Sequence, residues 1–109
     1  MLILFVEDDV RIRKAFKREI GNDHEIFEAE NGQEALDILR TMKFDLVITD
    51  NSMPVMNGLD LCLNIHELGI GVKVIMISGE DRPDLLSNQV IFFKKPITAT
   101  EILERVNSH

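Results

Sequence analysis

The stretch Asp45-Leu-Val-Ile-Thr-Asp50 decides the fold, because it reads as a buried strand that ends in a carboxylate. In α/β proteins the end of such a strand lies at the rim of the sheet, where functional sites are built. A second apolar run, residues 2–6, ends in the same way at Glu7 and Asp8. If the two strands are parallel neighbours, three carboxylates converge. Carboxylates that lie close together repel one another, and a bound divalent cation commonly offsets this repulsion.

Strand-like and helix-like patterns alternate along the whole chain. Strands are predicted at residues 2–6, 24–29, 46–49, 72–77 and 90–93. Apolar strands that alternate with amphipathic helices imply one domain, residues 1–109, with a parallel sheet covered by helices on both faces. Four helices are predicted from apolar residues that recur on one face. The first has Ile12, Phe16 and Ile20 on that face, and the third, residues 58–68, has Leu61, Ile65 and Leu68. The second begins at Asn31 and Glu34 and has Ala35, Ile38, Leu39 and Met42 as its apolar face, and the last begins at Thr98 and Glu101 and buries Ala99, Ile102, Leu103 and Val106.

Composition limits the classes of function. The chain has 109 residues, of which 45% are apolar, enough to fill one core. Its net charge of -7 argues against direct nucleic-acid binding, which needs clustered Lys and Arg. The single cysteine, Cys62, permits no internal disulfide and lies among apolar residues, so we expect a packed thiol in a reducing compartment. Without a secretion signal or a run of about 20 apolar residues, we expect a soluble protein of the cytoplasm.

The residues at the carboxyl ends of the predicted strands form a chemically coherent set. They are three acids, a hydroxyl and an ammonium: Glu7, Asp8, Asp50, Ser78 and Lys95. That set suits phosphoryl transfer onto a carboxylate, with a hard cation bound by acids and the phosphoryl oxygens bound by the other groups. Each residue also has a plainer interpretation. Asp50 could be a turn residue, and Lys95 could be a solvated neighbour of Lys94. Glu7, Asp8 and Ser78 could each cap a helix.

The ordered set of strand-end motifs resembles the receiver domain of response regulators, from residue 1 to about residue 107. The motifs that carry the resemblance are Val6-Glu-Asp-Asp9, Asp50 with Met53-Pro54 and Asn57-Gly58, Ile77-Ser-Gly79, and Lys95-Pro96. The resemblance implies a five-stranded parallel sheet in the flavodoxin-like order 2-1-3-4-5. It also implies a role in two-component signalling.

The resemblance further implies a role for each matching residue. Asp50 would accept a phosphoryl group from a sensor histidine kinase or a histidine phosphotransfer protein, and the chain would be a signalling phosphoacceptor rather than an enzyme. Mg²⁺ or Mn²⁺ would be bound by Asp8, Asp50, Glu7 and the backbone carbonyl of Ser52. Ser78 and Lys95 would bind the phosphoryl group, Ser78 and Phe92 would switch, and the Lys95-Pro96 bond is expected to be cis. The downstream target stays open, as does a homodimer.

The chain departs from the family between Ser78 and Lys95, where it is several residues shorter than usual and lacks the usual Gly-Ala pair. We therefore expect the fourth helix to be short, distorted or missing. This motivates an alternative, a constitutive interaction module that keeps the fold without the switch. An aspartyl-phosphate hydrolase of the haloacid dehalogenase type would need a second acid at Ser52. A flavodoxin is disfavoured because Glu7-Asp8-Asp9 would repel the flavin phosphate.

Overall fold

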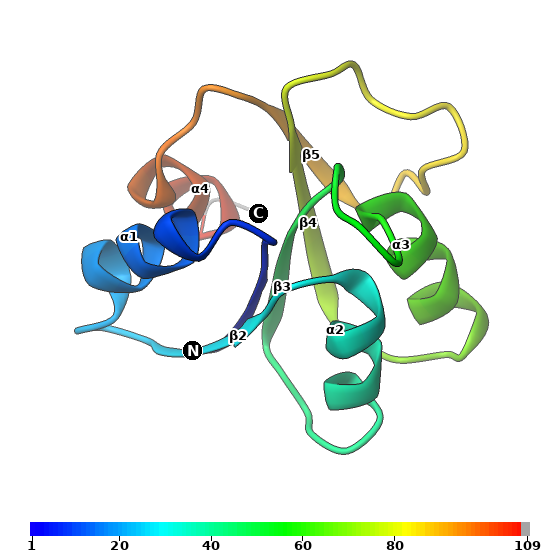
Figure 1. The fold of residues 1–109 in the computed structure, drawn as a ribbon, viewed down its shortest axis with the longest axis horizontal. Helices are drawn as coiled ribbons and strands as arrows, with labels where there is room; N and C mark the ends of the chain where they lie inside the picture. The colour runs from blue at the N-terminus through cyan, green and yellow to red at the C-terminus, as the bar shows by residue number, and fades with distance from the viewer. Residues whose placement is uncertain (108–109) are drawn as a thin grey trace.

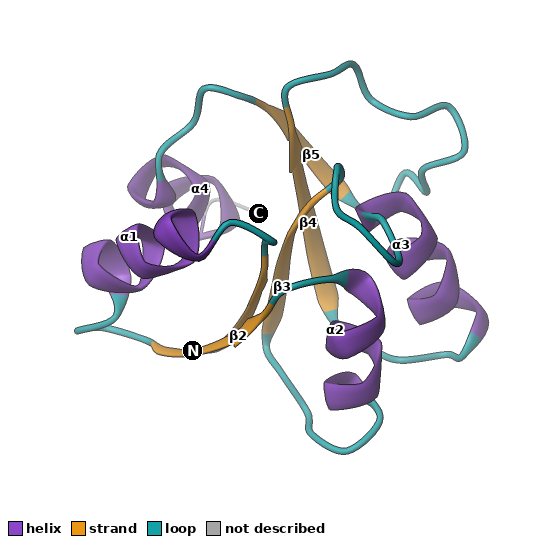
Figure 2. Ribbon diagram, in the orientation of Figure 1, coloured by secondary structure: helices purple, strands orange, loops and turns teal. Residues whose placement is uncertain are grey.

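The computed structural model describes residues 1–107, and over that range strands and helices alternate except that the fourth and fifth strands follow one another without a helix (Figures 1 and 2). The strands are β1 (Leu2–Val6), β2 (Glu25–Ala29), β3 (Leu46–Asp50), β4 (Lys73–Ser78) and β5 (Ile91–Lys94). The helices are α1 (Val10–Ile20), α2 (Gly32–Leu39), α3 (Gly58–Glu67) and α4 (Ala99–Asn107). None of these helices has the length and apolar character required to cross a bilayer.

The five strands form one parallel sheet in the order β2-β1-β3-β4-β5, which confirms the predicted fold. Strand β1 therefore lies between β2 and β3, with Val6 opposite Thr49. Figure 1 shows α1 and α4 on one face of the sheet and α2 and α3 on the other. The carboxyl ends of β1 and β3 are thus neighbours at one edge of the sheet.

Strand β1 is buried on both faces, which fixes the position of the acids that follow it. Successive side chains of a strand point to opposite faces. Ile3 and Phe5 pack on the side of α1 and α4, whereas Leu4 and Val6 pack on the side of α2 and α3. The Phe5 ring stacks on Phe16 of α1, with 4.0 Å between ring centroids. Each fully buried apolar side chain contributes about 1.5–3 kcal/mol, so the strand is held firmly from both sides.

The helices begin at capping side chains, several of which the sequence predicts. In α4 the box is reciprocal: Thr98 Oγ1 accepts from the Glu101 N–H (3.1 Å), and Glu101 Oε1 accepts from the Thr98 N–H (3.2 Å). The Asn31 and Thr98 caps are both confirmed. In the other three helices a side chain accepts a hydrogen bond from a first-turn N–H: Asp9 from Arg11, Asn31 from Glu34 and Asn57 from Asp60.

Three apolar residues that were expected in helix stripes are exposed instead. Ile12, Met42 and Leu68 expose 42%, 36% and 49% of their surface. Met42 and Leu68 lie beyond the last residues of α2 and α3, so the helical period no longer directs them inward. Ile12 lies within α1 but lines an open groove of about 380 Å³ between α1 and α4. The predicted boundaries of β4 and β5 also fall one residue too early.

No helix lies between β4 and β5, so the expectation of a shortened or missing fourth helix is confirmed for the described chain. The connection, residues 79–90 (loop 79–90 below), consists of turns and bends. The Arg82 guanidinium donates to the carbonyls of Ser87 (2.6 Å) and Val90 (3.2 Å). Leu86, which is 5% exposed, packs into the core on the side of α2 and α3. Arg82 thus supplies part of the hydrogen bonding that a helix would otherwise provide.

Cys62 lies on the buried face of α3, as expected from its apolar neighbours. Burial raises the pKa of its thiol to about 12. The neutral thiol is therefore the form present near neutral pH, and it is a poor nucleophile and metal ligand. The prediction of a packed thiol is confirmed.

Candidate functional site

Three carboxylates from two neighbouring strands meet at the carboxyl edge of the sheet. Glu7 and Asp8 follow β1, and Asp50 is the last residue of β3. One oxygen of each carboxylate lies within 4.8 Å of the others. Glu7 and Asp50 are buried, with 2% and 6% of their surface exposed, whereas Asp8 is exposed. The predicted convergence is therefore present, and we call these three residues the acidic cluster.

Glu7 carries the clearest sign that the acidic cluster suits a cation. Its Oε2 accepts a hydrogen bond from the Asp9 N–H (3.3 Å), but its buried Oε1 has no hydrogen-bond partner among the described residues. Burial raises the pKa of Glu7 to about 7, and the neighbouring Asp8 and Asp50 carboxyl groups act in the same direction. A hard divalent cation takes oxygen ligands and offsets such charges. The donor set therefore fits Mg²⁺ or Mn²⁺.

The main chain at Asp50 is fixed by the start of α3. A Cβ at residue 58 would lie 2.4 Å from the Asp50 carbonyl oxygen and 2.9 Å from the Asn51 Cα, so only glycine allows this close approach. The Gly58 N–H donates to the Asn51 carbonyl (2.9 Å), and the Leu59 N–H donates to Asn51 Oδ1 (2.9 Å). Gly58 therefore ties the end of β3 to the start of α3.

The loop of residues 51–57 connects β3 to α3 and carries Ser52. Ser52 is exposed and lies two residues beyond Asp50 in the chain. The loop rests on the start of α2, because the Met56 carbonyl accepts a hydrogen bond from the Gly32 N–H (3.0 Å). The proposed metal contact of the Ser52 carbonyl stays a prediction.

Lys95 and Ser78 complete the edge of the sheet. Lys95 Nζ lies 3.2 Å from Asp50 Oδ1, and the Lys95 N–H donates to the Ser78 carbonyl (2.8 Å). Ser78 is buried, and its Oγ accepts a hydrogen bond from the Glu80 N–H (3.1 Å). The hydroxyl proton of Ser78 therefore remains available for another acceptor. The Lys95-Pro96 peptide bond is cis, as expected.

Phe92 belongs to the sheet rather than to the acidic cluster. It pairs with Met76 across β4 and β5 and is partly buried against the core on the side of α2 and α3. Leu86 and Val90 of loop 79–90 belong to the same core. The proposed role of Phe92 as a switching aromatic stays a prediction.

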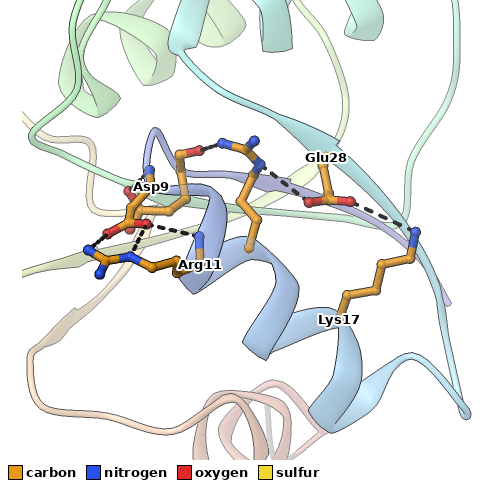
Figure 3. Close-up of polar contacts among 6 residues, drawn as sticks. Asp9, Arg11, Lys17 and Glu28 are labelled. Carbon is orange, nitrogen blue, oxygen red and sulfur yellow. Dashed lines mark hydrogen bonds and ion pairs between the residues drawn. The ribbon is translucent and has the colours of Figure 1, made fainter.

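Arg13 is a contact of the site that the sequence pattern did not reveal. Its Nη1 donates to the main-chain carbonyl of Glu7 at 2.6 Å, and its Nε lies 3.3 Å from Glu28 Oε1. Lys17 Nζ lies 3.8 Å from the other Glu28 oxygen, a contact that Figure 3 shows, so Glu28 pairs with both cations. A basic residue on a helix that follows strand-end acids is a weak signal, because most such side chains are solvated.

The side chain of Asp9 is directed at α1 and not at the acidic cluster, although its N–H donates to Glu7. Its carboxylate caps α1 through the Arg11 N–H (2.9 Å) and forms an ion pair with the Arg11 side chain (3.2 Å), as Figure 3 shows. The hydrogen bonds from Arg11 hold the pKa of Asp9 below its usual range. Asp9 is therefore the N-cap of α1.

Comparisons with known proteins agree on one family. The family model of the response regulator receiver domain matches residues 3–107. Response regulator MprA of Mycolicibacterium vanbaalenii is 27% identical over 115 residues, which cover 97% of this chain and 48% of MprA. The chain thus spans about half the length of the curated relatives it matches.

Solved structures extend the likeness to three dimensions. Response regulator TrrA of Thermotoga maritima, in complex with Mg²⁺-BeF, is 33% identical with a TM-score of 0.87, over 98% of this chain and 96% of TrrA. The receiver domain of the hybrid histidine kinase CckA is 32% identical with a TM-score of 0.80, over 99% of this chain and 97% of that domain. Both matches extend over almost the whole chain.

Proposed function

The chain belongs to the response regulator receiver domain family, and from this premise we propose that Asp50 accepts a phosphoryl group from a histidine kinase or a histidine phosphotransfer protein. Proteins of this family act in two-component signalling. The observation that carries the proposal is a buried Asp50 beside two further acids, with Lys95 Nζ 3.2 Å from its carboxylate. The domain would be a phosphoacceptor that assists its own phosphorylation and dephosphorylation.

In the proposed reaction an Asp50 oxygen attacks the phosphorus of a phosphohistidine on the partner. The P–N bond breaks as the P–O bond of the acyl phosphate forms, and the imidazole leaves with the electron pair and takes up a proton. Lys95 can then pair with one phosphoryl oxygen, and Ser78 can donate its unused hydroxyl proton to another. Both groups are therefore suited to stabilise the charge that develops on the transferred phosphoryl group.

We assign Glu7, Asp8 and Asp50, together with the Ser52 carbonyl, to binding of Mg²⁺ or Mn²⁺. The bound ion would offset the negative charge of the phosphoryl group and the carboxylates. The buried Glu7 Oε1 without a hydrogen-bond partner among the described residues supports this assignment. The complex of TrrA with Mg²⁺-BeF, in a protein 33% identical, supports it as well.

A constitutive interaction module is the second candidate, and loop 79–90 favours it. This connection has no helix, so the surface that a fourth helix would offer is built differently. Such a module would present the same surface with or without a phosphoryl group. Failure of Asp50 to react would favour this candidate.

The test of the proposal is intact-mass spectrometry after incubation with acetyl phosphate or phosphoramidate and Mg²⁺. We expect the wild-type protein to gain one phosphoryl group and Asp50→Asn to gain none. Asp37→Asn, which changes an exposed acid on α2, is the matched control and should react normally. Equal labelling of Asp50→Asn and the wild type would refute the assignment of Asp50.

The proposal also covers the setting in which the domain works. We propose that residues 1–109 form one receiver unit and that it acts in the cytoplasm beside its kinase. The net charge of -7 supports an output through protein contacts instead of direct nucleic-acid binding by this domain. The downstream target and a homodimer are left open.

A further inference from the structure

Arg13 contacts the acidic cluster through the main chain and not through a carboxylate. It lies in α1 with only 13% of its side chain exposed, and its Nη1 donates to the Glu7 carbonyl oxygen at 2.6 Å. Within residues 1–107, no hydrogen bond or ion pair joins Arg13 to the carboxylates of the acidic cluster. Its role therefore differs from that of Lys95, which pairs directly with Asp50.

The carbonyl that Arg13 binds belongs to the peptide group between the two adjacent acids, Glu7 and Asp8. The Glu7 N–H still donates to the Ala29 carbonyl of β2 (3.0 Å), but beyond this bond the chain leaves the sheet. A peptide group is planar, so fixing its carbonyl fixes the direction in which the next Cα leaves. Because Asp8 is exposed, packing does little to hold its side chain. The hydrogen bond from Arg13 therefore constrains the main chain from which the Asp8 side chain departs.

Arg13 is in turn held by an anion on a different strand. Glu28 Oε1 of β2 lies 3.3 Å from Arg13 Nε, and Glu28 Oε2 lies 3.8 Å from Lys17 Nζ; Figure 3 shows the contact between Glu28 and Lys17. The guanidinium is thus anchored to the sheet at one end and bonded to the Glu7 carbonyl at the other. Residues in the outer shell of a metal site orient the metal ligands through hydrogen bonds of this kind.

We propose that Arg13 is a positioning residue for the acidic cluster, which orients the Glu7–Asp8 peptide and thereby strengthens binding of the divalent cation. This inference rests on the proposed function, which assigns a cation to the cluster. A purely electrostatic role predicts the opposite sign, because a positive charge near three carboxylates repels a cation and its removal would tighten binding. A purely structural role predicts lower stability with unchanged affinity for the cation.

The test is calorimetric titration of the purified protein with Mn²⁺ alone, since the chain has no Trp or Tyr to report binding by fluorescence. We expect Arg13→Gln to weaken Mn²⁺ binding about tenfold, the lower end of the range for losing an outer-shell partner of a metal site. Lys17→Gln also removes one positive charge and a contact with Glu28, but it removes no contact with Glu7. Its affinity for Mn²⁺ should therefore be unchanged or slightly higher. Arg13→Lys keeps the charge and should fall between Arg13→Gln and the wild type.

Unchanged or tighter Mn²⁺ binding by folded Arg13→Gln would overturn the proposal. If Arg13→Gln does not fold, Arg13→Lys decides: weaker binding at the same net charge supports the positioning role, and wild-type affinity overturns it. Asp8→Asn separates this inference from the proposed function. Binding lost in Asp8→Asn but intact in Arg13→Gln refutes only the role of Arg13, whereas a wild-type protein that binds no Mn²⁺ refutes both.

Discussion

Replacement of Gly58 by alanine should destabilise the protein and displace the end of the strand that carries Asp50. The added Cβ would meet the Asp50 carbonyl oxygen at 2.4 Å, the Asn51 Cα at 2.9 Å and the Asp50 carbonyl carbon at 3.1 Å. All three atoms belong to the backbone, so no side-chain rotation relieves the clash. Relief requires about 1 Å of separation between α3 and the end of β3, judged from normal non-bonded distances.

Overpacking of this kind costs about 1–3 kcal/mol. For a domain of this size that corresponds to a Tm lower by roughly 4–20 °C. A shift of this size at a reacting group can also slow a reaction by about a hundredfold. We therefore expect Gly58→Ala to unfold at lower temperature by circular dichroism and to be labelled slowly by acetyl phosphate.

Gly71→Ala is the matched control for this substitution. A Cβ at residue 71 would meet no atom within 4 Å, and the backbone of Gly71 does not have a positive φ. It should therefore leave Tm and labelling of Asp50 unchanged. The reasoning is refuted if Gly58→Ala matches Gly71→Ala in both measurements.

Three further outcomes are expected. The metal-free protein should lose up to about 3 kcal/mol of stability as the pH rises from about 4.5 to about 7. The pKa of Glu7 is about 7 in the folded protein and 4.5 in the unfolded chain, so between these pH values the folded state binds a proton that the unfolded chain has released. Urea unfolding across this range should show the decline, and Glu7→Gln should abolish it. Lys95→Met removes the cation 3.2 Å from Asp50, so it should tighten Mn²⁺ binding in calorimetry while slowing phosphorylation; weaker Mn²⁺ binding would contradict the assignment. Arg82→Met leaves the carbonyls of Ser87 and Val90 without their hydrogen-bond donor. It should lower the free energy of unfolding in urea by about 1–3 kcal/mol and speed amide exchange in loop 79–90. Wild-type stability of this variant would argue against the role of Arg82.

Much of the fold could be predicted because strand and helix patterns depend on local periodicity. The apolar runs that end at Val6 and at Asp50 identify β1 and β3, and the Thr98 box marks the start of α4. Periodicity fails where an element stops. Met42 and Leu68 continue the spacing of their helices but lie beyond the helix ends, where the backbone no longer turns them inward.

The acidic cluster was predictable because parallel pairing brings strand ends together, whatever the details of packing. Contacts that depend on how a helix lies against the sheet could not be predicted from the sequence. The bond from Arg13 to the Glu7 carbonyl needs the actual orientation of α1, and the path of loop 79–90 depends on where Arg82 reaches. Charged side chains carry little sequence signal of this kind, since most of them are solvated.

The most direct test of the central claim is to locate the phosphoryl group in the wild-type chain. After labelling with acetyl phosphate and Mg²⁺, reduction with borohydride would convert an acyl phosphate on aspartate to homoserine, and peptide mass spectrometry would give its position. We predict homoserine at residue 50 and at no other aspartate. Homoserine elsewhere, or none in a protein that carries a phosphoryl group, would contradict the assignment of Asp50 as the phosphoacceptor.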